Sequence, residues 1–444
     1  MLTVKRHGPT AVAVVLAGHL IAGCLAGVRA RDQREPRAYA LLNGRWLASD
    51  RFEPRTMYVV GNVFRTAAPA RIDSTIDLTG GYVVPPYAEA HNHWLEPKLA
   101  PAYNEKYLLD GVFYVADLGN APFIHARLDS ITNRPTGVDF RSAHQGWTGP
   151  GGHPLEIVGQ LSAAGAFPPP ATPEALDDFV FVVTTEAEID QKWPKFLAGH
   201  PSMVKAFLIS SDEYAKRRHD DRVGKNRGMD PALLPGLVRR AHQAGLPLAV
   251  HVATAADFHT AVAAGVDWIA HLPFFEETRG SKALPNASLI SEEDAKLAAE
   301  RHITVVPTIA WLHAEYTDSA KIARILRELL VPNLGLLKRN GVTMLVGSDQ
   351  FRQTSVVEAR VLAETGVFTN AELLRMWTQT TPRAIFPARK IGRLDDGFEA
   401  SFLVLDGDPI QDFSATGKIR LRMKQGVWLT PSAARAQLPP LPGS

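Results

Sequence analysis

Short apolar runs alternate with longer, helix-like stretches through the middle of the chain. The runs cover residues 81–91, 111–119, 138–144, 203–210, 246–253, 266–272, 303–311 and 342–349. Near-continuous apolar strands that are separated by helices predict a parallel sheet covered on both faces. Eight such units in succession predict an α/β protein built on a (β/α)8, TIM-like barrel.

Both flanks of this region have a different pattern. Residues 31–85 and 385–432 contain short strand-like segments rich in turns, without a long helical period. We expect these two stretches to meet in a small β-sandwich domain beside a barrel formed by residues 86–384. Residues 433–444 are rich in proline and are expected to form a frayed tail.

The first 30 residues have the features of a targeting segment. Two basic residues precede a mostly apolar, uncharged stretch over 10–28. Three interpretations stay open: a lipobox that ends at Cys24, which would be lipidated; a signal peptide cleaved after Ala30; and an uncleaved membrane anchor. All three predict export, to the periplasm or to a lipid anchor at the cell envelope.

Composition excludes several classes of protein. Of the 444 residues, 45% are hydrophobic and 21% are charged, which is typical of a globular chain. Lys and Arg (48) nearly balance Asp and Glu (46), so the basic surplus of a nucleic-acid-binding protein is missing. A single cysteine excludes an intramolecular disulfide framework and a cysteine-rich metal site. The expected partner is a small-molecule substrate.

Side chains that bind metals stand at the ends of several predicted strands, where barrel enzymes carry their active sites. Five of them stand at strand ends, and a lysine within the fourth predicted strand completes the set. The candidates are His91, His93, Lys205, His251, His271 and Asp349. Residues i and i+2 of a strand point to the same side, so His91 and His93 can reach one ion. Each residue alone has an ordinary structural explanation, but together they predict a metal site. Imidazole and carboxylate ligands suit zinc and its neighbours.

Several sequence motifs accompany this set. They include VVPPYAEAHNH, TGPGGHP, AAGVDWIAHLPF, GSD and the closing IGRLDDGFEASFLVLDGDPI. The chain thereby resembles the amidohydrolase superfamily of metal-dependent hydrolases, in its binuclear subtype. The most similar branch contains dipeptidases that cleave Xaa-Pro, Xaa-Arg and N-acyl amino acids. Pro86 and Ser401 depart from the family pattern, which has glycine and aspartate there, but both are structural positions.

The resemblance implies that two divalent metal ions, with zinc as the expected metal, are held by this set. His91, His93 and Asp349 would bind the more buried ion. His251 and His271 would bind the second.

Lys205 would be carboxylated by CO₂ to a carbamate that bridges the ions. An ammonium beside two dications is disfavoured, so its pKa should fall and leave a neutral amine able to react. The expected nucleophile is a hydroxide that bridges the metals, whose proton Asp349 takes and passes to the leaving amine. His153, after the third strand, and Tyr214, after the fourth, are candidate donors to the developing oxyanion or to a substrate carboxylate. For both, a hydrogen bond that only stabilises a loop is the alternative.

The sequence thus predicts an exported hydrolase of amide bonds in dipeptides or N-acyl amino acids. One alternative is a lactonase, cyclic-amide hydrolase or carbamate hydrolase with the same centre. A second is a surface-anchored ligand-binding protein without turnover. A deaminase is disfavoured, since Thr254 rather than glutamate stands three residues after His251. An oligomer is possible, and its size is left open.

Overall fold

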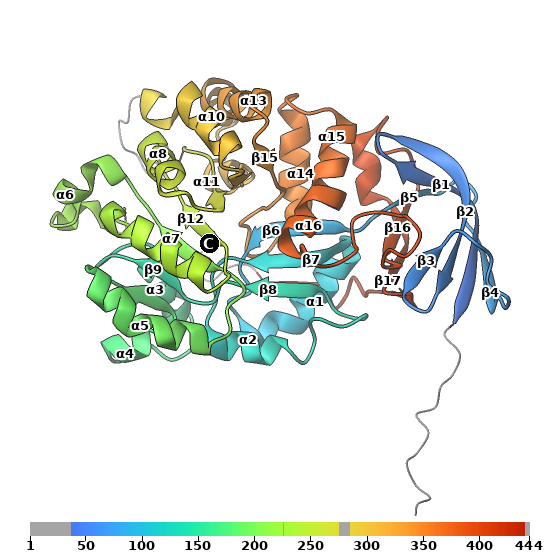
Figure 1. Cartoon of the computed structure of the whole chain (residues 1–444), viewed down its shortest axis with the longest axis horizontal. Coiled ribbons are helices and arrows are strands. Elements are labelled where there is room, and N and C mark those ends of the chain that lie inside the picture. Colours follow the sequence, from blue (N-terminus) through green and yellow to red (C-terminus); the bar gives the residue numbers. More distant parts are fainter. Residues whose placement is uncertain (1–36, 225, 275–284, 440–444) are drawn as a thin grey trace, which may run out of the picture. The chain divides into compact units, whose positions relative to one another are not determined.

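The computed structural model describes residues 37–224, 226–274 and 285–439 (Figure 1). The predicted targeting segment, with Cys24, lies outside these residues, and so does the end of the predicted tail. Within the described part, no helix combines the length and apolar character needed to span a bilayer.

Parallel strands form the middle of the described chain. Their bounds are β6 (Tyr87–Asn92), β7 (Val112–Asp117), β8 (Asp139–Ser142), β9 (Gly146–Thr148), β10 (Val180–Val182), β11 (Val204–Phe207), β12 (Leu248–His251), β13 (Trp268–Ala270), β14 (Thr304–Val306) and β15 (Thr343–Met344). Seven of them form a sheet in the order β10-β9-β11-β12-β13-β14-β15, and β6-β7-β8 form another. Each predicted apolar run contains one of these strands, which confirms the α/β class with parallel strands.

Strand pairing joins the described strands into two sheets rather than into one ring. The third predicted run contains β8, and β9 is a separate strand beyond it, after His144, whose φ of 52° is left-handed. β8 pairs with β7, whereas β9 pairs with β11 and with the unpredicted strand β10. Elsewhere the sheets meet through the Ala90 N–H, which donates to Val346 O at 2.9 Å. A closed barrel stays a prediction.

Helices alternate with these strands and lie around the outside of them (Figure 1). They are α1 (Ala100–Leu109), α2 (Pro122–Leu128), α3 (Leu155–Ala163), α4 (Pro173–Leu176), α5 (Glu186–Ala198), α6 (Tyr214–Arg217), α7 (Leu234–Gln243), α8 (Ala255–Ala264), α10 (Glu292–Glu300), α11 (Trp311–Glu315), α12 (Ser319–Ile325), α13 (Val331–Arg339), α14 (Ser355–Glu364), α15 (Asn370–Arg375) and α16 (Thr381–Ile385). Local signals set their ends. α8, for example, begins with a capping box between Thr254 and Asp257 and ends at Gly265, whose φ is 73°.

The two chain ends share one sheet. Its strands are β1 (Ala38–Ala48), β2 (Arg51–Val60), β3 (Val63–Arg65), β4 (Ser74–Asp77), β5 (Tyr82–Val84), β16 (Phe402–Leu405), β17 (Ile419–Lys424) and β18 (Val427–Trp428). β16 pairs antiparallel with β5, so the late strands complete the early ones. β1 pairs with β4 before an irregularity at Leu41/Gly44 and with β5 after it. Hydrogen bonding thus connects all eight strands, and the two-layer sandwich stays a prediction.

A buried ionic network ties this sheet to the parallel strands. The Lys424 ammonium, at the end of β17, donates to Asp139 Oδ1 at 2.7 Å and to Arg134 O at 2.8 Å. Arg389 donates to Asp139 Oδ2 at 2.7 Å and to Glu399 Oε2 at 2.6 Å. Because Asp139 is the first residue of β8, the network lies at the amino ends of the parallel strands.

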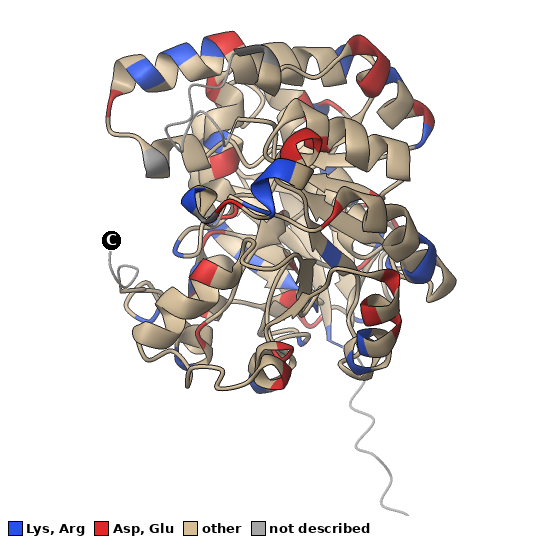
Figure 2. Ribbon diagram, turned by 90° about the vertical axis from the view of Figure 1, so that its left-hand side faces the viewer, with Lys and Arg blue, Asp and Glu red and all other residues tan. Residues whose placement is uncertain are grey.

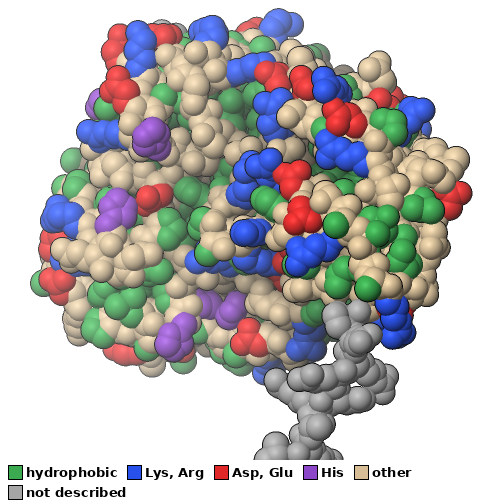
Figure 3. Space-filling model, turned by 45° about the vertical axis from the view of Figure 1, so that its right-hand side comes forward, with side chains coloured by type: hydrophobic (Ala, Val, Ile, Leu, Met, Phe, Trp, Pro, Cys, Tyr) green, Lys and Arg blue, Asp and Glu red, His purple; other side chains and the backbone are tan. Residues whose placement is uncertain are grey.

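Surface charge is mixed rather than segregated. Lys and Arg alternate with Asp and Glu over the outer helices in Figure 2, and both kinds lie side by side on the face shown in Figure 3. This agrees with the formal net charge of +2.

Candidate functional site

A cavity of about 350 Å³ lies at the carboxyl ends of the parallel strands. Its polar lining includes every metal-binding candidate from the sequence, together with His153: His91, His93, His153, Lys205, His251, His271 and Asp349. Side chains far apart in the chain therefore converge on one space. Tyr214 is not among the described residues that line it.

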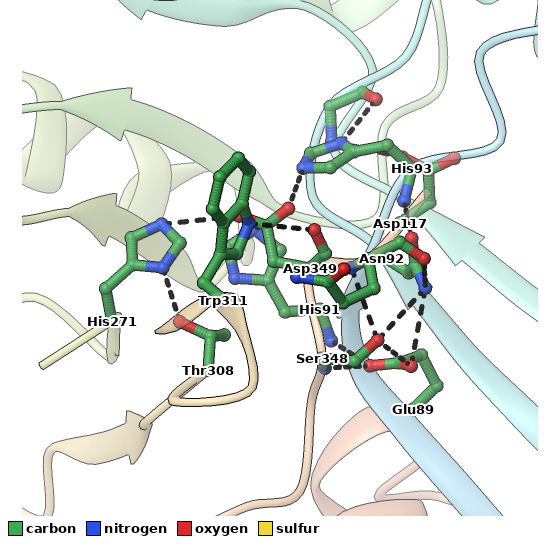
Figure 4. Close-up of polar contacts among 12 residues, drawn as sticks. Glu89, His91, Asn92, His93, Asp117, His271, Thr308, Trp311, Ser348 and Asp349 are labelled. Atoms are coloured by element: carbon green, nitrogen blue, oxygen red, sulfur yellow. Dashed lines mark hydrogen bonds and ion pairs between the residues drawn. The ribbon is translucent and has the colours of Figure 1, made fainter. Parts of the chain in front are cut away.

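Asp349 is the point at which three of the imidazoles meet (Figure 4). Its Oδ1 lies 3.1 Å from His93 Nε2 and 3.6 Å from His91 Nε2, and its Oδ2 lies 3.9 Å from His271 Nε2. One ligand atom each from His91, His271 and Asp349 lie within 4.8 Å of one another. Nitrogen and oxygen donors at this spacing can hold a divalent metal ion.

The orientation of His93 is set by its other ring nitrogen. Nδ1 lies 2.9 Å from Gly119 O. A carbonyl oxygen can only accept, so Nδ1 carries a proton and donates, and Nε2 faces Asp349. Metal-binding histidines are held by this arrangement in general.

His271 is held from behind by a longer chain of contacts. Its Nδ1 lies 2.6 Å from Thr308 Oγ1, in the turn after β14. That turn is fixed by Glu358 of α14, whose carboxylate accepts from Ile309 N at 3.0 Å and from Ala310 N at 2.7 Å. Burial raises the pKa of Glu358 to about 8, although these backbone donors oppose the shift. The sequence analysis did not include Thr308 or Glu358.

His251 extends the cluster toward the loop after β9. Its ring centroid lies 4.4 Å from that of His271 and 5.0 Å from that of His153. His153 Nδ1 lies 2.6 Å from Glu156 Oε1 on α3, so the carboxylate orients this imidazole as well. Lys205 is 1% exposed, and its Nζ has no hydrogen-bond partner among the described residues.

Burial and crowding keep most of these groups in their neutral forms. Burial lowers the pKa of Lys205 to about 7, against the opposing charge of Asp349. Burial, followed by the nearby charge of Lys205, holds the pKa of His91 well below its usual value, and burial with His91 and Lys205 does the same for His271. Burial opposes protonation of His93, but the hydrogen bond and charge of Asp349 raise its pKa overall. Neutral imidazoles are the forms that bind metals, and the neutral amine is the form that reacts with CO₂.

The backbone adopts uncommon conformations at the site. Three residues that follow the strands β13, β14 and β15 have left-handed φ values. These are 78° at His271, 50° at Thr308 and 53° at Asp349. Left-handed φ values in non-glycine residues cost free energy and cluster at functional sites. Gly347 is required for a different reason, since a Cβ there would lie 2.7 Å from His91 N. Because glycine has no Cβ, the segment before Asp349 can pass close to β6.

Glu89 is a further residue that the sequence analysis missed. It is fully buried and accepts from Ser348 N at 2.7 Å, from Ser348 Oγ at 2.8 Å and from His91 N at 3.2 Å. Burial raises its pKa to about 8. Glu89 thus joins the backbone of His91 to that of Ser348, the residue before Asp349. Its position two residues before His91, on the same side of the strand, was the available signal.

Tyr214 lies away from this cluster. It begins α6, and its ring packs near the Arg218 guanidinium, whose carbon lies 5.7 Å from the ring centroid. The suggested role of Tyr214 at the reacting atoms stays a prediction without support from this arrangement.

The sequence was compared with protein-family models and with curated proteins. A family model described as "Amidohydrolase family" matches residues 205–429, about half of the chain. A search of curated proteins finds no match.

Similar folds occur among solved structures. A prolidase complexed with N-methylphosphonate-L-proline has a TM-score of 0.66 at 19% identity, over 89% of this chain and 100% of that one. A Xaa-Pro dipeptidase with bound methionine has a TM-score of 0.69 at 18% identity, over 88% and 99%. The A. niger ochratoxinase has a TM-score of 0.67 at 15% identity, over 89% and 96%. At these identities the likeness shows a shared fold.

Proposed function

The chain belongs to the amidohydrolase family, and we propose on that premise that it hydrolyses amide C–N bonds with divalent metal ions held in the cavity. The observation that carries this proposal is the convergence of imidazoles on Asp349, beside a buried lysine whose Nζ has no hydrogen-bond partner among the described residues. Such a lysine is costly unless a ligand or a modification uses it.

The residues fit the metal centre that the family implies. Neutral imidazoles and a carboxylate are zinc ligands, and the His93 and His271 rings are each held at Nδ1 so that Nε2 faces Asp349. We assign one ion to His91, His93 and Asp349, and a second to His251 and His271.

Lys205, as a carbamate, would supply oxygen ligands to the ions. Its pKa of about 7 leaves a substantial neutral fraction, and only the neutral amine adds CO₂. When bound, the ions polarise the substrate carbonyl and make water acidic enough to deprotonate near neutral pH.

Asp349 moves the proton in this scheme. Its carboxylate faces the cavity, and it accepts a proton from the attacking water and donates it to the departing amine nitrogen. Trp311 Nε1 donates to Asp349 O at 3.0 Å, and the Asp349 N–H donates to His91 O at 2.6 Å, so the backbone behind the carboxylate is fixed.

His153 is assigned to the substrate carbonyl oxygen. It lines the cavity, and the contact of its Nδ1 with Glu156 Oε1 at 2.6 Å orients the imidazole there. Tyr214 is given no part in this scheme.

Dipeptides and N-acyl amino acids are the first substrates to screen. The prolidase and the Xaa-Pro dipeptidase among the similar folds support this choice. Lactones, cyclic amides and carbamates form the second group, because the same centre can attack any of these carbonyl carbons.

The architecture and location form part of the proposal. A (β/α)8 barrel is supported by the Ala90–Val346 hydrogen bond and by the similar folds. Export with a lipid anchor at Cys24 is supported by the sequence of residues 1–30. If it is correct, Cys24→Ser should move the protein from the membrane fraction to the soluble fraction.

Asp349→Asn tests the proposal against the alternative of a ligand-binding protein. A hydrolase should lose at least about 10³-fold in kcat while ligand affinity changes far less. A metal-loaded wild-type protein that binds such amides without cleaving any of them would instead support a binding role.

A further inference from the structure

Part of the cavity wall is apolar. It is formed by Ile124 of α2, Ile157 and Leu161 of α3, and Phe167 and Phe179 from the segment that follows. We call these five residues the apolar wall. They belong to a small hydrophobic cluster that is separate from the main core.

The apolar wall presents aromatic surface to the cavity. The rings of Phe167 and Phe179 have centroids 4.4 Å apart and an interplanar angle of 35°. Phe123 packs on Phe179 at 5.4 Å but is 40% exposed and does not line the cavity. Side chains that border an open cavity lack contacts on that side, so an apolar group placed there gains dispersion and desolvation energy.

Few charged residues line the cavity. Among the described lining residues, Lys205 is the only lysine or arginine, and it lies in the histidine cluster. Glu156, which precedes Ile157 on α3, is paired with His153 at 2.6 Å. Apart from Lys205, no described lysine or arginine lines the cavity to pair with a free carboxylate.

We propose that the substrates are amides that carry a bulky, uncharged aromatic group, which packs against the apolar wall. This inference rests on the proposed amide hydrolysis. Water adds OH to the carbonyl carbon and H to the amine nitrogen as the C–N bond breaks, so a carboxylic acid and an amine leave. Small amides and amides with a free carboxylate on the aromatic part are poor substrates.

The test compares matched substrates with the metal-loaded enzyme. N-(2-naphthoyl)glycinamide and acetyl-2-naphthylamide carry the ring on the acyl side and the amine side, and N-acetylglycinamide lacks it. We expect the better naphthyl substrate to exceed N-acetylglycinamide by about 10²-fold in kcat/KM. The 6-carboxy analogue of that substrate should be at least about tenfold poorer than the substrate itself.

Variants separate the apolar wall from general packing. Phe167→Ala should lower kcat/KM for the naphthyl substrate about tenfold and change it less than about twofold for N-acetylglycinamide. Phe123→Ala, which touches the same cluster from outside, should change neither. Phe167→Leu keeps the wall apolar and protects the comparison if the alanine variant fails to fold, as judged by its melting temperature. Phe167→Leu should lower kcat/KM for the naphthyl substrate alone, by a smaller factor than Phe167→Ala.

Several results would overturn the inference while leaving amide hydrolysis intact. These are equal rates for naphthyl and acetyl substrates, equal losses for both in Phe167→Leu, or a carboxylated analogue that is the better substrate. If no amide is cleaved, the proposed function fails. Binding of 2-naphthamide then tests whether the apolar wall holds an aromatic group. Saturable binding that weakens in Phe167→Leu but not in Phe123→Ala supports the apolar wall, and binding that is absent or equal in all three proteins contradicts it.

Discussion

Two lysines are buried among the described residues, at opposite ends of the parallel strands, and their surroundings differ. Lys424 is 0% exposed, and its ammonium donates to Asp139 Oδ1 at 2.7 Å and to Arg134 O at 2.8 Å. Lys205 is 1% exposed, and its Nζ has no hydrogen-bond partner within the described ranges.

The difference distinguishes a buried lysine that stabilises the fold from one that is available to react. Burial lowers the pKa of both lysines, but Asp139 opposes the shift at Lys424 with a direct hydrogen bond. At Lys205 only the charge of Asp349 opposes burial, and the pKa falls to about 7. Lys424 is thus a structural cation, whereas Lys205 is an amine kept available for a ligand or for CO₂.

Exchange of Lys205 for an apolar side chain should have the largest effect, and it should fall on metal binding and activity rather than on the stability of the fold. Lys205→Met is expected to lower kcat by about 10³-fold, because the proposed bridge between the ions is lost. The melting temperature of the metal-free variant should equal or exceed that of the metal-free wild type, since an unpaired buried amine has been removed. A metal-free variant that melts much lower would show that Lys205 supports the fold.

The same exchange at Lys424 should have the opposite outcome. Lys424→Met leaves Asp139 with one cationic partner fewer and should reduce the free energy of unfolding by about 3 kcal/mol in urea denaturation. The kcat of the folded fraction should stay unchanged. Lys296→Met is the control, since its exposed pair with Glu292 should contribute less than about 1 kcal/mol. Equal losses in both variants would remove the distinction between buried and surface pairs.

Glu358 sharpens the comparison, because it is buried near the metal-binding candidates yet acts through the backbone. Glu358→Gln should weaken metal affinity about tenfold by loosening the turn that positions Thr308 behind His271. Metal affinity is measured by competition with a chelator. Glu372→Gln, which loses a comparable hydrogen bond from Thr369 N at 2.8 Å on the surface, should leave that affinity unchanged.

Reconstitution of the metal-free protein should depend modestly on bicarbonate and pH. A base is neutral above its pKa, so the reactive fraction of Lys205 rises as pH increases through about 7. At constant dissolved CO₂, recovery of activity should therefore be several-fold faster at pH 8 than at pH 6. Recovery that is independent of CO₂ would argue against a carbamate, even if metals bind.

The strands and most of the candidate site were accessible from sequence because their signals are local. An apolar run marks a buried strand, and its last residues mark the functional end, so His251 and Asp349 were found without knowledge of the fold. Alternation along the first strand identified His91 and His93 in the same way.

The remaining features depend on contacts between distant segments. Lys424 and Asp139 are separated by 285 residues, and neither has a local pattern that predicts an ion pair. Glu358 acts on a turn that its own helix approaches only in the folded chain. The separation of β8 from β9 follows from the left-handed conformation at His144. Tertiary structure, rather than propensity, decides each of these features.

The metal content of the full-length wild-type protein and of Lys205→Met tests the central claim most directly. Both proteins are expressed with zinc and bicarbonate and analysed by elemental mass spectrometry. We predict about two metal ions per wild-type chain and about one or fewer in the folded variant. A folded wild-type protein that holds almost no metal, or a variant that holds as much as the wild type, would contradict the account of Lys205 as the bridge of a metal centre.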